Sequence, residues 1–172
     1  MKKHNGMRPH DIAILLKIAV KGRQSWYMKD LSYELCISAG EVSESINRSM
    51  LAGLISYDKK TLMKMALLDF LKYGFKYVFP QQAGAVVRGI ATAHSAPPLN
   101  GLLMSEEKYV WAYAEGNERG QMIESLHPNI PEACLKDERY YELMALLDAL
   151  RVGKVREYNL AFDIIKERID NA

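Results

Sequence analysis

The spacing of a few aliphatic residues in the first third of the chain limits most strongly what it can fold into. Leu31 and Leu35 are one helical turn apart. Val42 and Ile46 repeat this spacing after a short break. Two short helices leave both pairs exposed unless a third helix covers them, so the pattern predicts a small trihelical core.

The boundaries of these helices are marked by capping signals. Pro9 suits a first helical position, apolar residues then recur at helical spacing, and Gly22 ends this amphipathic pattern. The helix that carries Val42 is predicted to begin after Ser38. Glu41 follows three residues later and completes a capping box, in which each side chain satisfies a free backbone N–H. The sequence therefore predicts three successive helices.

A longer pattern joins these signals. A Leu-rich stretch at 30–35 is followed by Ile37-Ser38, by Val42-Ser43 and by Gly53-Leu54-Ile55. These elements resemble the helix-turn-helix of bacterial winged-helix transcriptional regulators, MarR-like ones included. The resemblance covers about residues 8–58, and it implies that the third helix enters a DNA major groove.

The predicted third helix carries polar residues opposite or beside its apolar face. Asn47 can pair with adenine, Arg48 with guanine or phosphate, and Ser43 with phosphate or either base. Glu44 shares this face and opposes phosphate contact unless it accepts a hydrogen bond from a cytosine amine or faces away from the DNA. Cations outside this helix are expected to contact backbone phosphates, and they are Arg23, Lys29, Lys59 and Lys60.

The distribution of charge supports this interpretation better than the net charge of +2 does. Residues 1–76 hold 13 Lys and Arg against 7 Asp and Glu, a balance of +6. Residues 77–172 hold 10 against 14, a balance of −4. Such asymmetry favours a half that faces DNA and a half with another role.

The remainder predicts an α+β fold. Residues 61–72 form a helical pattern that is apolar nearly all round, which predicts a buried linking helix. Residues 75–91 and 109–123 alternate with period two and predict two β-hairpins. Amphipathic helices are predicted at about 137–150 and 154–169, with Gly153 between them. The predicted units are 1–60 for DNA binding, 61–74 for linking, and 75–172 for dimerisation, partner or effector binding.

The two predicted hairpins look like copies. Lys76-Tyr77-Val78-Phe79 and Lys108-Tyr109-Val110-Trp111 are each followed by a glycine and then by an Arg-Gly pair. Their aromatic stripes are expected to be the buried face of a sheet, or alternatively to stack on a planar effector or a nucleic-acid base. The strand and wing that usually follow such a helix are shortened here, so either the first hairpin takes the place of the wing or the chain has none. The basic residues expected at a wing or anion contact are Lys76, Arg88 and Arg119.

Several classes of protein are not expected. The chain carries no P-loop, G-x-G-x-x-G, G-x-S-x-G or H-E-x-x-H motif, so we expect neither an enzyme nor a bound cofactor. Cys36 and Cys134 lack metal-ligand spacing, and His94 and His127 are interpreted as loop histidines without a metal. No targeting segment or stretch of ~20 apolar residues is found, so a cytoplasmic protein without membrane contact is expected.

The sequence thus predicts a sequence-specific, DNA-binding transcriptional regulator that acts as a homodimer on double-stranded DNA. The alternative is a protein-interaction module, such as a regulatory or antitoxin-like partner, that uses the winged-helix fold as a scaffold. In either case the C-terminal helices, with Tyr140, Tyr141 and Met144, are expected to contact a second copy or another protein. A small-molecule sensor is compatible with the first prediction, and an aromatic-lined cavity between the hairpins and the last two helices would favour it.

Overall fold

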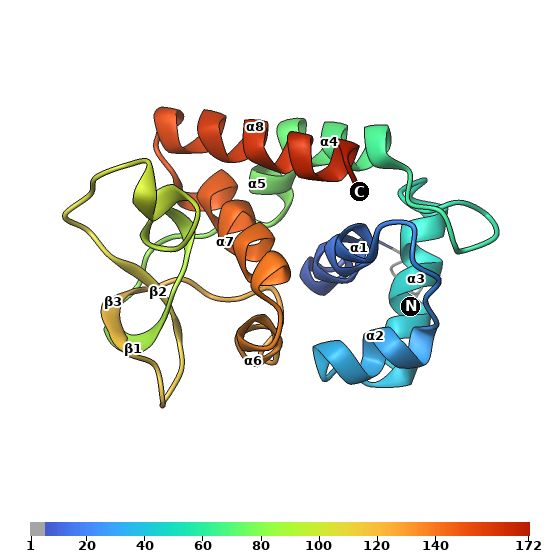
Figure 1. Cartoon of the computed structure of the whole chain (residues 1–172), viewed down its shortest axis with the longest axis horizontal. Coiled ribbons are helices and arrows are strands. Elements are labelled where there is room, and N and C mark those ends of the chain that lie inside the picture. Colours follow the sequence, from blue (N-terminus) through green and yellow to red (C-terminus); the bar gives the residue numbers. More distant parts are fainter. Residues whose placement is uncertain (1–5) are drawn as a thin grey trace.

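The computed structural model describes residues 6–172, and about 54% of the chain is helical. Within this range there are eight α-helices, two short 3-10 helices and a small three-stranded sheet (Figure 1). The predicted α+β class is confirmed at this level. The α-helices are α1 (Pro9–Lys21), α2 (Met28–Leu35), α3 (Ala39–Leu51), α4 (Lys64–Tyr73), α5 (Phe75–Val78), α6 (Ile130–Leu135), α7 (Glu138–Val152) and α8 (Val155–Asp170). The strands are β1 (Val86–Ala91), β2 (Tyr109–Ala112) and β3 (Glu118–Met122), and the 3-10 helices are Ala93–Ser95 and Leu99–Gly101.

The three N-terminal helices form as predicted. Helix α1 begins at Pro9 and ends at Gly22, whose φ of +58° is the left-handed conformation that favours glycine. At the start of α3 the Ser38 hydroxyl accepts a hydrogen bond from the Glu41 backbone N–H at 3.2 Å. The Glu41 carboxylate accepts from the Ser38 hydroxyl, so the structure shows one of the two predicted capping-box bonds.

Helix α1 differs from the prediction in its burial. It is not amphipathic, because residues from His10 to Ala19 are all buried, including the charged Asp11 and Lys17. The reason is its position, since α1 packs against α2 and α3 on one side and against α7 on the other (Figure 1). The Lys17 ammonium lies 2.5 Å from Asp137 and 3.1 Å from Glu34, and these ion pairs join α1 to the start of α7 and to α2.

A tight hairpin follows α3. Ile55 and Leu62 form an antiparallel bridge, and the Ser56 N–H donates to the Thr61 carbonyl at 2.8 Å. The tip consists of residues 57–60. We call residues 54–63 the short hairpin.

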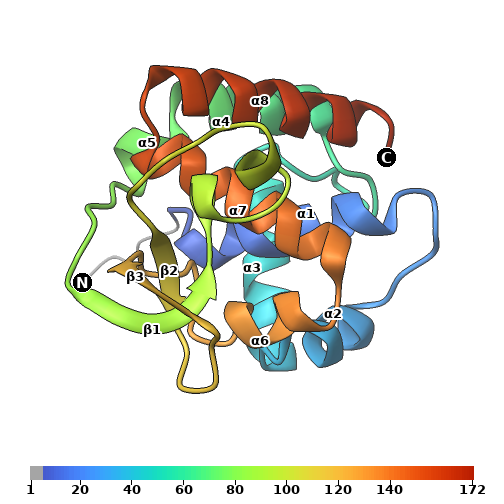
Figure 2. The same ribbon diagram turned by 60° about the vertical axis from the view of Figure 1, so that its left-hand side comes forward.

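The sequence predicted that this helix is buried on all sides, but α4 is buried on one face only. Its inner face, with Leu67, Leu68 and Leu71, is buried, whereas Met65 is exposed. The helix lies at the surface beside α8 in both views (Figures 1 and 2).

The prediction of a β-hairpin at residues 75–91 is wrong. Residues 75–78 form α5, and only 86–91 form a strand. Phe75 and Phe79 are four residues apart, a spacing that places them on one face of a helical turn as well as of a strand. Their rings pack against each other and against Phe70, with centroids 5.9–6.3 Å apart, so tertiary packing decides between the two conformations.

The second predicted hairpin is also wrong in its pairing. Strand β1 pairs antiparallel with both β2 and β3, while β2 and β3 pair in parallel and close the sheet into a small barrel. The two segments that look like copies therefore have different structures. A Cβ atom on Gly89 would lie 1.8 Å from the Trp111 carbonyl oxygen, so the close approach of β1 and β2 requires glycine at this position.

One buried carboxylate ties the sheet to α7. Asp148 accepts hydrogen bonds from the Trp111 indole N–H at 2.6 Å and from the Thr92 hydroxyl at 2.7 Å. Its other oxygen accepts from the Arg151 guanidinium at 2.6 Å, and Arg151 also donates to the Glu124 carbonyl. The network therefore connects α7 to all three strands, because Thr92 directly follows β1, Trp111 lies in β2 and Glu124 follows β3.

The C-terminal helices α7 and α8 form within a few residues of their predicted bounds. Tyr140 and Met144, however, are buried in the core of this chain, so they are not available for a second molecule. Tyr141 is half-buried and donates to the Ala91 carbonyl at 2.6 Å. Buried apolar residues form one continuous cluster from Ile12 to Ile169, so the core is not divided at the predicted boundaries. In the described part of the chain, no helix has the length and apolar character needed to cross a membrane.

Candidate nucleic-acid interface

Two of the predicted phosphate-contacting lysines meet at one aromatic ring. Lys29 is the second residue of α2, and its ammonium lies 5.5 Å from the centre of the Tyr27 ring. Lys60, from the short hairpin, lies 5.4 Å from the same ring and 5.0 Å from the Trp26 ring. It also donates to the Trp26 carbonyl at 3.3 Å. The fold thus brings together cations from two distant segments.

Arg23 and Lys59 belong to the same region. Arg23 is exposed and, with Lys60 and Lys64, lines a hollow of about 490 Å³ between the end of α1, the short hairpin and the end of α8. Lys59 lies at the hairpin tip with a φ of +59°. We define Arg23, Lys29, Lys59 and Lys60 as the basic cluster.

The basic cluster keeps its charge available to a partner. None of its four side chains forms an ion pair with a carboxylate of residues 6–172. The one acidic residue at the hairpin tip, Asp58, accepts hydrogen bonds from the Ser56 hydroxyl and from the Lys60 backbone N–H, and the Ser56 bond chiefly holds its pKa below the usual value. That carboxylate is therefore used in shaping the turn.

The outer face of α3 carries polar but not basic residues. Ser43 and Asn47 are half-buried there, while Glu44 and Leu51 are exposed. Ser43 and Asn47 therefore remain accessible as predicted contacts. The basic cluster lies in the loop after α1, at the start of α2 and in the short hairpin rather than on α3 itself.

Arg48 does not occupy the position predicted for it. Its side chain is buried, with 9% of the residue surface exposed, and forms a bidentate ion pair with the fully buried Asp11. Its Nε donates to one Asp11 oxygen at 2.9 Å and Nη2 donates to the other at 2.7 Å. These bonds raise the pKa of the guanidinium, and Glu44 lies 3.6 Å away on the open side. Arg48 is therefore a structural link between α1 and α3.

A sequence signal for this link existed. Asp11 is an acidic residue at the start of an otherwise apolar helix, and a carboxylate buried with that helix requires a cationic partner. Helical periodicity places Arg48 on the flank of α3. It does not show which neighbouring helix covers that flank, so it does not predict that Arg48 is buried.

His10 borders this ion pair. Its ring is buried, with Nε2 at 3.3 Å from Arg48 Nη2, and it meets His127 edge-on at 5.7 Å between ring centres. Burial chiefly lowers the pKa of His10, and the charge of Arg48 and the neighbouring His127 lower it further, against the opposing effect of Asp11 and Glu41. Folding therefore favours neutral His10.

This lowered pKa predicts a loss of stability on mild acidification. The unfolded chain binds a proton at His10 near pH 6.5, and the folded chain binds it only at lower pH, so the contribution of neutral His10 falls as pH drops through 6.5. Urea unfolding followed by circular dichroism between about pH 7.5 and pH 5.5 measures this slope. His10→Gln should have a flatter dependence than the wild type, and equal slopes would contradict the assignment.

The three residues predicted at a wing or anion contact do not form one group. Lys76 lies on α5, with its ammonium 5.1 Å from the Tyr158 ring of α8. Arg88 and Arg119 lie in the sheet, directly opposite each other on β1 and β3. The fold thus brings the two arginines together and places Lys76 elsewhere.

The second aromatic stripe belongs to the core rather than to an open stacking surface. Trp111 is buried with its ring 5.8 Å from that of Tyr141, and Tyr109 packs edge-on against His94 at 4.8 Å. His94 itself is buried, with Nε2 at 2.8 Å from the Glu107 carbonyl oxygen. Within residues 6–172, no three His, Cys, Asp or Glu side chains are grouped to hold a metal ion.

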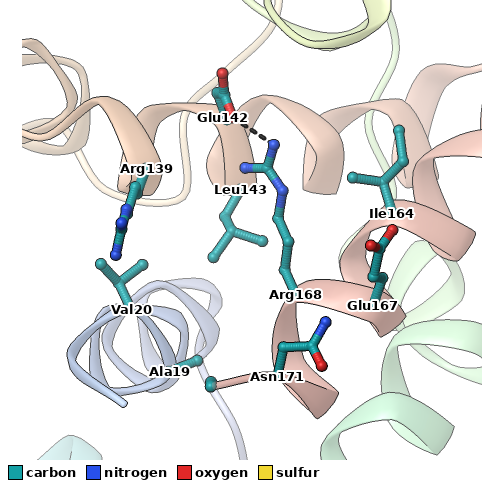
Figure 3. Close-up of a pocket in the computed structure, with 10 residues that line it drawn as sticks. Ala19, Val20, Arg139, Glu142, Leu143, Ile164, Glu167, Arg168 and Asn171 are labelled. Carbon is teal, nitrogen blue, oxygen red and sulfur yellow. Dashed lines mark ion pairs between the residues drawn. The ribbon is translucent and has the colours of Figure 1, made fainter.

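A hollow of about 530 Å³ opens between the end of α1, the start of α7 and the end of α8 (Figure 3). The ion pair between Glu142 and Arg168 crosses it. No aromatic side chain and no strand residue lines this space, so it is not the aromatic cavity that would favour a small-molecule sensor. Its lining residues are Ala19, Val20, Arg139, Glu142, Leu143, Ile164, Glu167, Arg168, Asn171 and Ala172.

Comparison of the chain with protein-family models, with curated proteins and with solved structures found no match.

Proposed function

We propose that this protein binds double-stranded DNA through α2, α3 and the short hairpin, and that it regulates transcription as a dimer. The observation that carries the proposal is the convergence of Lys29 and Lys60 on Tyr27, with Arg23 beside them. Cations that form no ion pair with a carboxylate of residues 6–172 and lie beside a helix-turn-helix are suited to backbone phosphates, which supply most of the affinity for DNA.

The order of elements supports the same proposal. Helices α1, α2 and α3 are followed by the short hairpin, the place that a wing occupies in the regulators that this segment resembles. We propose that the short hairpin, rather than residues 75–91, acts as a reduced wing, with Lys59 and Lys60 at its tip.

Base contacts are assigned to Ser43 and Asn47. Asn47 can form two hydrogen bonds with adenine, and Ser43 can contact a base or a phosphate. Glu44 would then accept a hydrogen bond from a cytosine amine, the base-edge donor that carboxylates contact in the major groove. Arg48 has no part in this proposal, because its guanidinium is bound to Asp11.

A dimer is proposed because two half-sites one turn apart require two copies of the reading helix. Since Tyr140 and Met144 are buried, an interface formed by the C-terminal helices would use the exposed side of α8.

Neutralising the basic cluster should change the salt dependence of DNA binding. The triple variant Arg23→Ala, Lys29→Ala and Lys60→Ala is expected to reduce the slope of log K against log salt by about 2–3, since each lost phosphate contact removes about 0.9. Fluorescence anisotropy with a pool of random-sequence duplexes, from about 50 to 200 mM salt, measures this slope.

The matched control is Lys108→Ala, an exposed cation directly before β2 and outside both the cluster and α8, which should leave the slope unchanged. Asn47→Ala should instead reduce discrimination between a selected site and the random pool, by about 1–3 kcal/mol. Identical slopes for the triple variant and the wild type would contradict the proposed interface.

A protein-interaction module is the second candidate, and the exposed residues of α2 and α3 favour it. Tyr33 on α2 and Leu51 on α3 are large side chains that lie open to solvent, and Glu44 gives the surface of α3 an acidic group. Exposed apolar side chains of this size are typical of protein contacts. Absence of any duplex binding at about 50 mM salt would favour this candidate over the first.

A further inference from the structure

A second surface, away from the basic cluster, combines aromatic rings with lysines. Tyr73 on α4 and Tyr77 on α5 have 67% and 70% of their surface exposed. Lys72 and Lys76 are the residues before them, and both are exposed. Tyr158 of α8 lies against them, and we call these five residues the tyrosine–lysine patch.

The side chains of the patch are held in an alternating arrangement. The Lys72 ammonium lies 5.3 Å from the centre of the Tyr73 ring, and the Lys76 ammonium lies 5.1 Å from the centres of both the Tyr77 and the Tyr158 rings. The Tyr158 hydroxyl donates to the Lys72 carbonyl at 2.5 Å. Burial raises the pKa of Tyr158, and its neighbours Tyr77 and Tyr73 raise it further, which reflects how closely the three phenols lie.

The charge of the patch is positive and unpaired. Neither Lys72 nor Lys76 forms an ion pair within the range 6–172, although Asp69 on α4 and Asp163 on α8 belong to helices that carry the patch. The lysines contact ring faces instead, an attraction of about 0.5–1 kcal/mol at exposed sites that leaves the ammonium groups open to a stronger anionic partner.

Rings interleaved with free cations have the chemistry of a surface for single strands. Successive bases stack on aromatic side chains whatever their sequence, while lysines follow the phosphates between them. A base-paired duplex cannot use such rings, since its base faces are already stacked. An apolar protein partner would gain little from two unpaired ammonium groups.

We propose that the tyrosine–lysine patch binds single-stranded nucleic acid, with bases stacked on Tyr73 and Tyr77 and phosphates bound by Lys72 and Lys76. This site is separate from the proposed duplex interface. The patch lies where α4 ends and α8 begins, whereas the short hairpin and its hollow lie at the start of α4 and the end of α8. Helix α2 lies on the opposite side of the molecule (Figure 1).

The test measures binding of the full chain to fluorescein-labelled oligo-dT and oligo-U by anisotropy. The wild type is expected to bind at about 50 mM salt, with a slope against log salt that decreases by about 1.4 in the double variant Lys72→Gln, Lys76→Gln. The double variant Tyr73→Ala, Tyr77→Ala is expected to weaken binding about 30-fold or more, and Tyr73→Phe, Tyr77→Phe should restore it because the rings remain.

Leu135→Ala is the matched control, since this large side chain is 57% exposed but lies at the end of α6, outside both proposed nucleic-acid surfaces, and the variant should bind the strands as the wild type does. Comparing the two oligonucleotides distinguishes DNA from RNA as the source of the strand. The proposal is overturned if the wild type binds neither strand, or if the alanine double variant binds both as the wild type does. The same proteins are also tested with vesicles of anionic phospholipid. The proposal is overturned if the alanine double variant loses binding to these vesicles and keeps binding to both oligonucleotides.

The same variants separate this proposal from the proposed duplex binding. The alanine double variant should bind duplexes normally, and the triple variant of the basic cluster should bind single strands normally. Loss of both activities in either variant would show one shared surface and overturn the assignment of a separate patch.

Discussion

Replacing Arg48 by alanine is expected to lower the free energy of unfolding by about 3–5 kcal/mol, because it leaves the buried Asp11 carboxylate without its cation. The remaining hydrogen bond to Asp11, from the Arg8 backbone N–H at 2.8 Å, cannot compensate for a lost bidentate pair. Urea unfolding followed by circular dichroism measures the loss.

Two comparisons make the Arg48 result specific. Arg23→Ala removes an exposed cation from the same part of the chain and should change stability by less than about 0.5 kcal/mol. The double variant Asp11→Ala, Arg48→Ala should lose less than the sum of the two single variants, with a coupling of about 0.5–3 kcal/mol. A stable Arg48→Ala protein with weakened duplex binding would show instead that Arg48 contacts DNA.

Replacing Asp148 by alanine is expected to have the largest effect on folding. The variant leaves the Arg151 guanidinium without its carboxylate, at a cost of about 3–5 kcal/mol. The buried Trp111 N–H and Thr92 hydroxyl also lose their acceptor, at about 1–3 kcal/mol each. Since domains are typically stable by about 5–15 kcal/mol, the sheet should separate from α7 or the chain should not fold.

Near-ultraviolet circular dichroism tests the Asp148 prediction, because the buried Trp111 gives a signal only when its surroundings are ordered. Asp148→Asn retains one acceptor for Arg151 but presents an amide to the two other donors, so an intermediate loss of stability is expected. Asp163→Ala, an exposed residue of α8, is the control. Native stability in Asp148→Ala would mean that the network contributes little to the contact between sheet and helix.

The basic cluster was predictable as a set of residues but not as a surface. The sequence indicates Lys29 and Lys60 as phosphate contacts beside a predicted helix-turn-helix, yet their meeting at Tyr27 depends on how the short hairpin folds back. Arg48 was selected by the same reasoning and is buried, since helical periodicity assigns a flank without saying what packs on it. The tyrosine–lysine patch was not predicted, because Tyr77 was placed in a strand and Tyr158 joins it from a distant helix.

The sequence alone determined where α1 ends and where α3 begins, since a cap such as Gly22 or Ser38 acts within a single turn of the chain. Tertiary structure decided how β1, β2 and β3 pair and which charged residues are buried. Strand pairing and the burial of Asp11, Arg48 and Asp148 depend on partners far away in the chain, and no local pattern records them. The free energy of a buried charge depends on its partner. Only the folded structure therefore distinguishes a charged residue that is open to a ligand from one that is paired inside the protein and stabilises the fold.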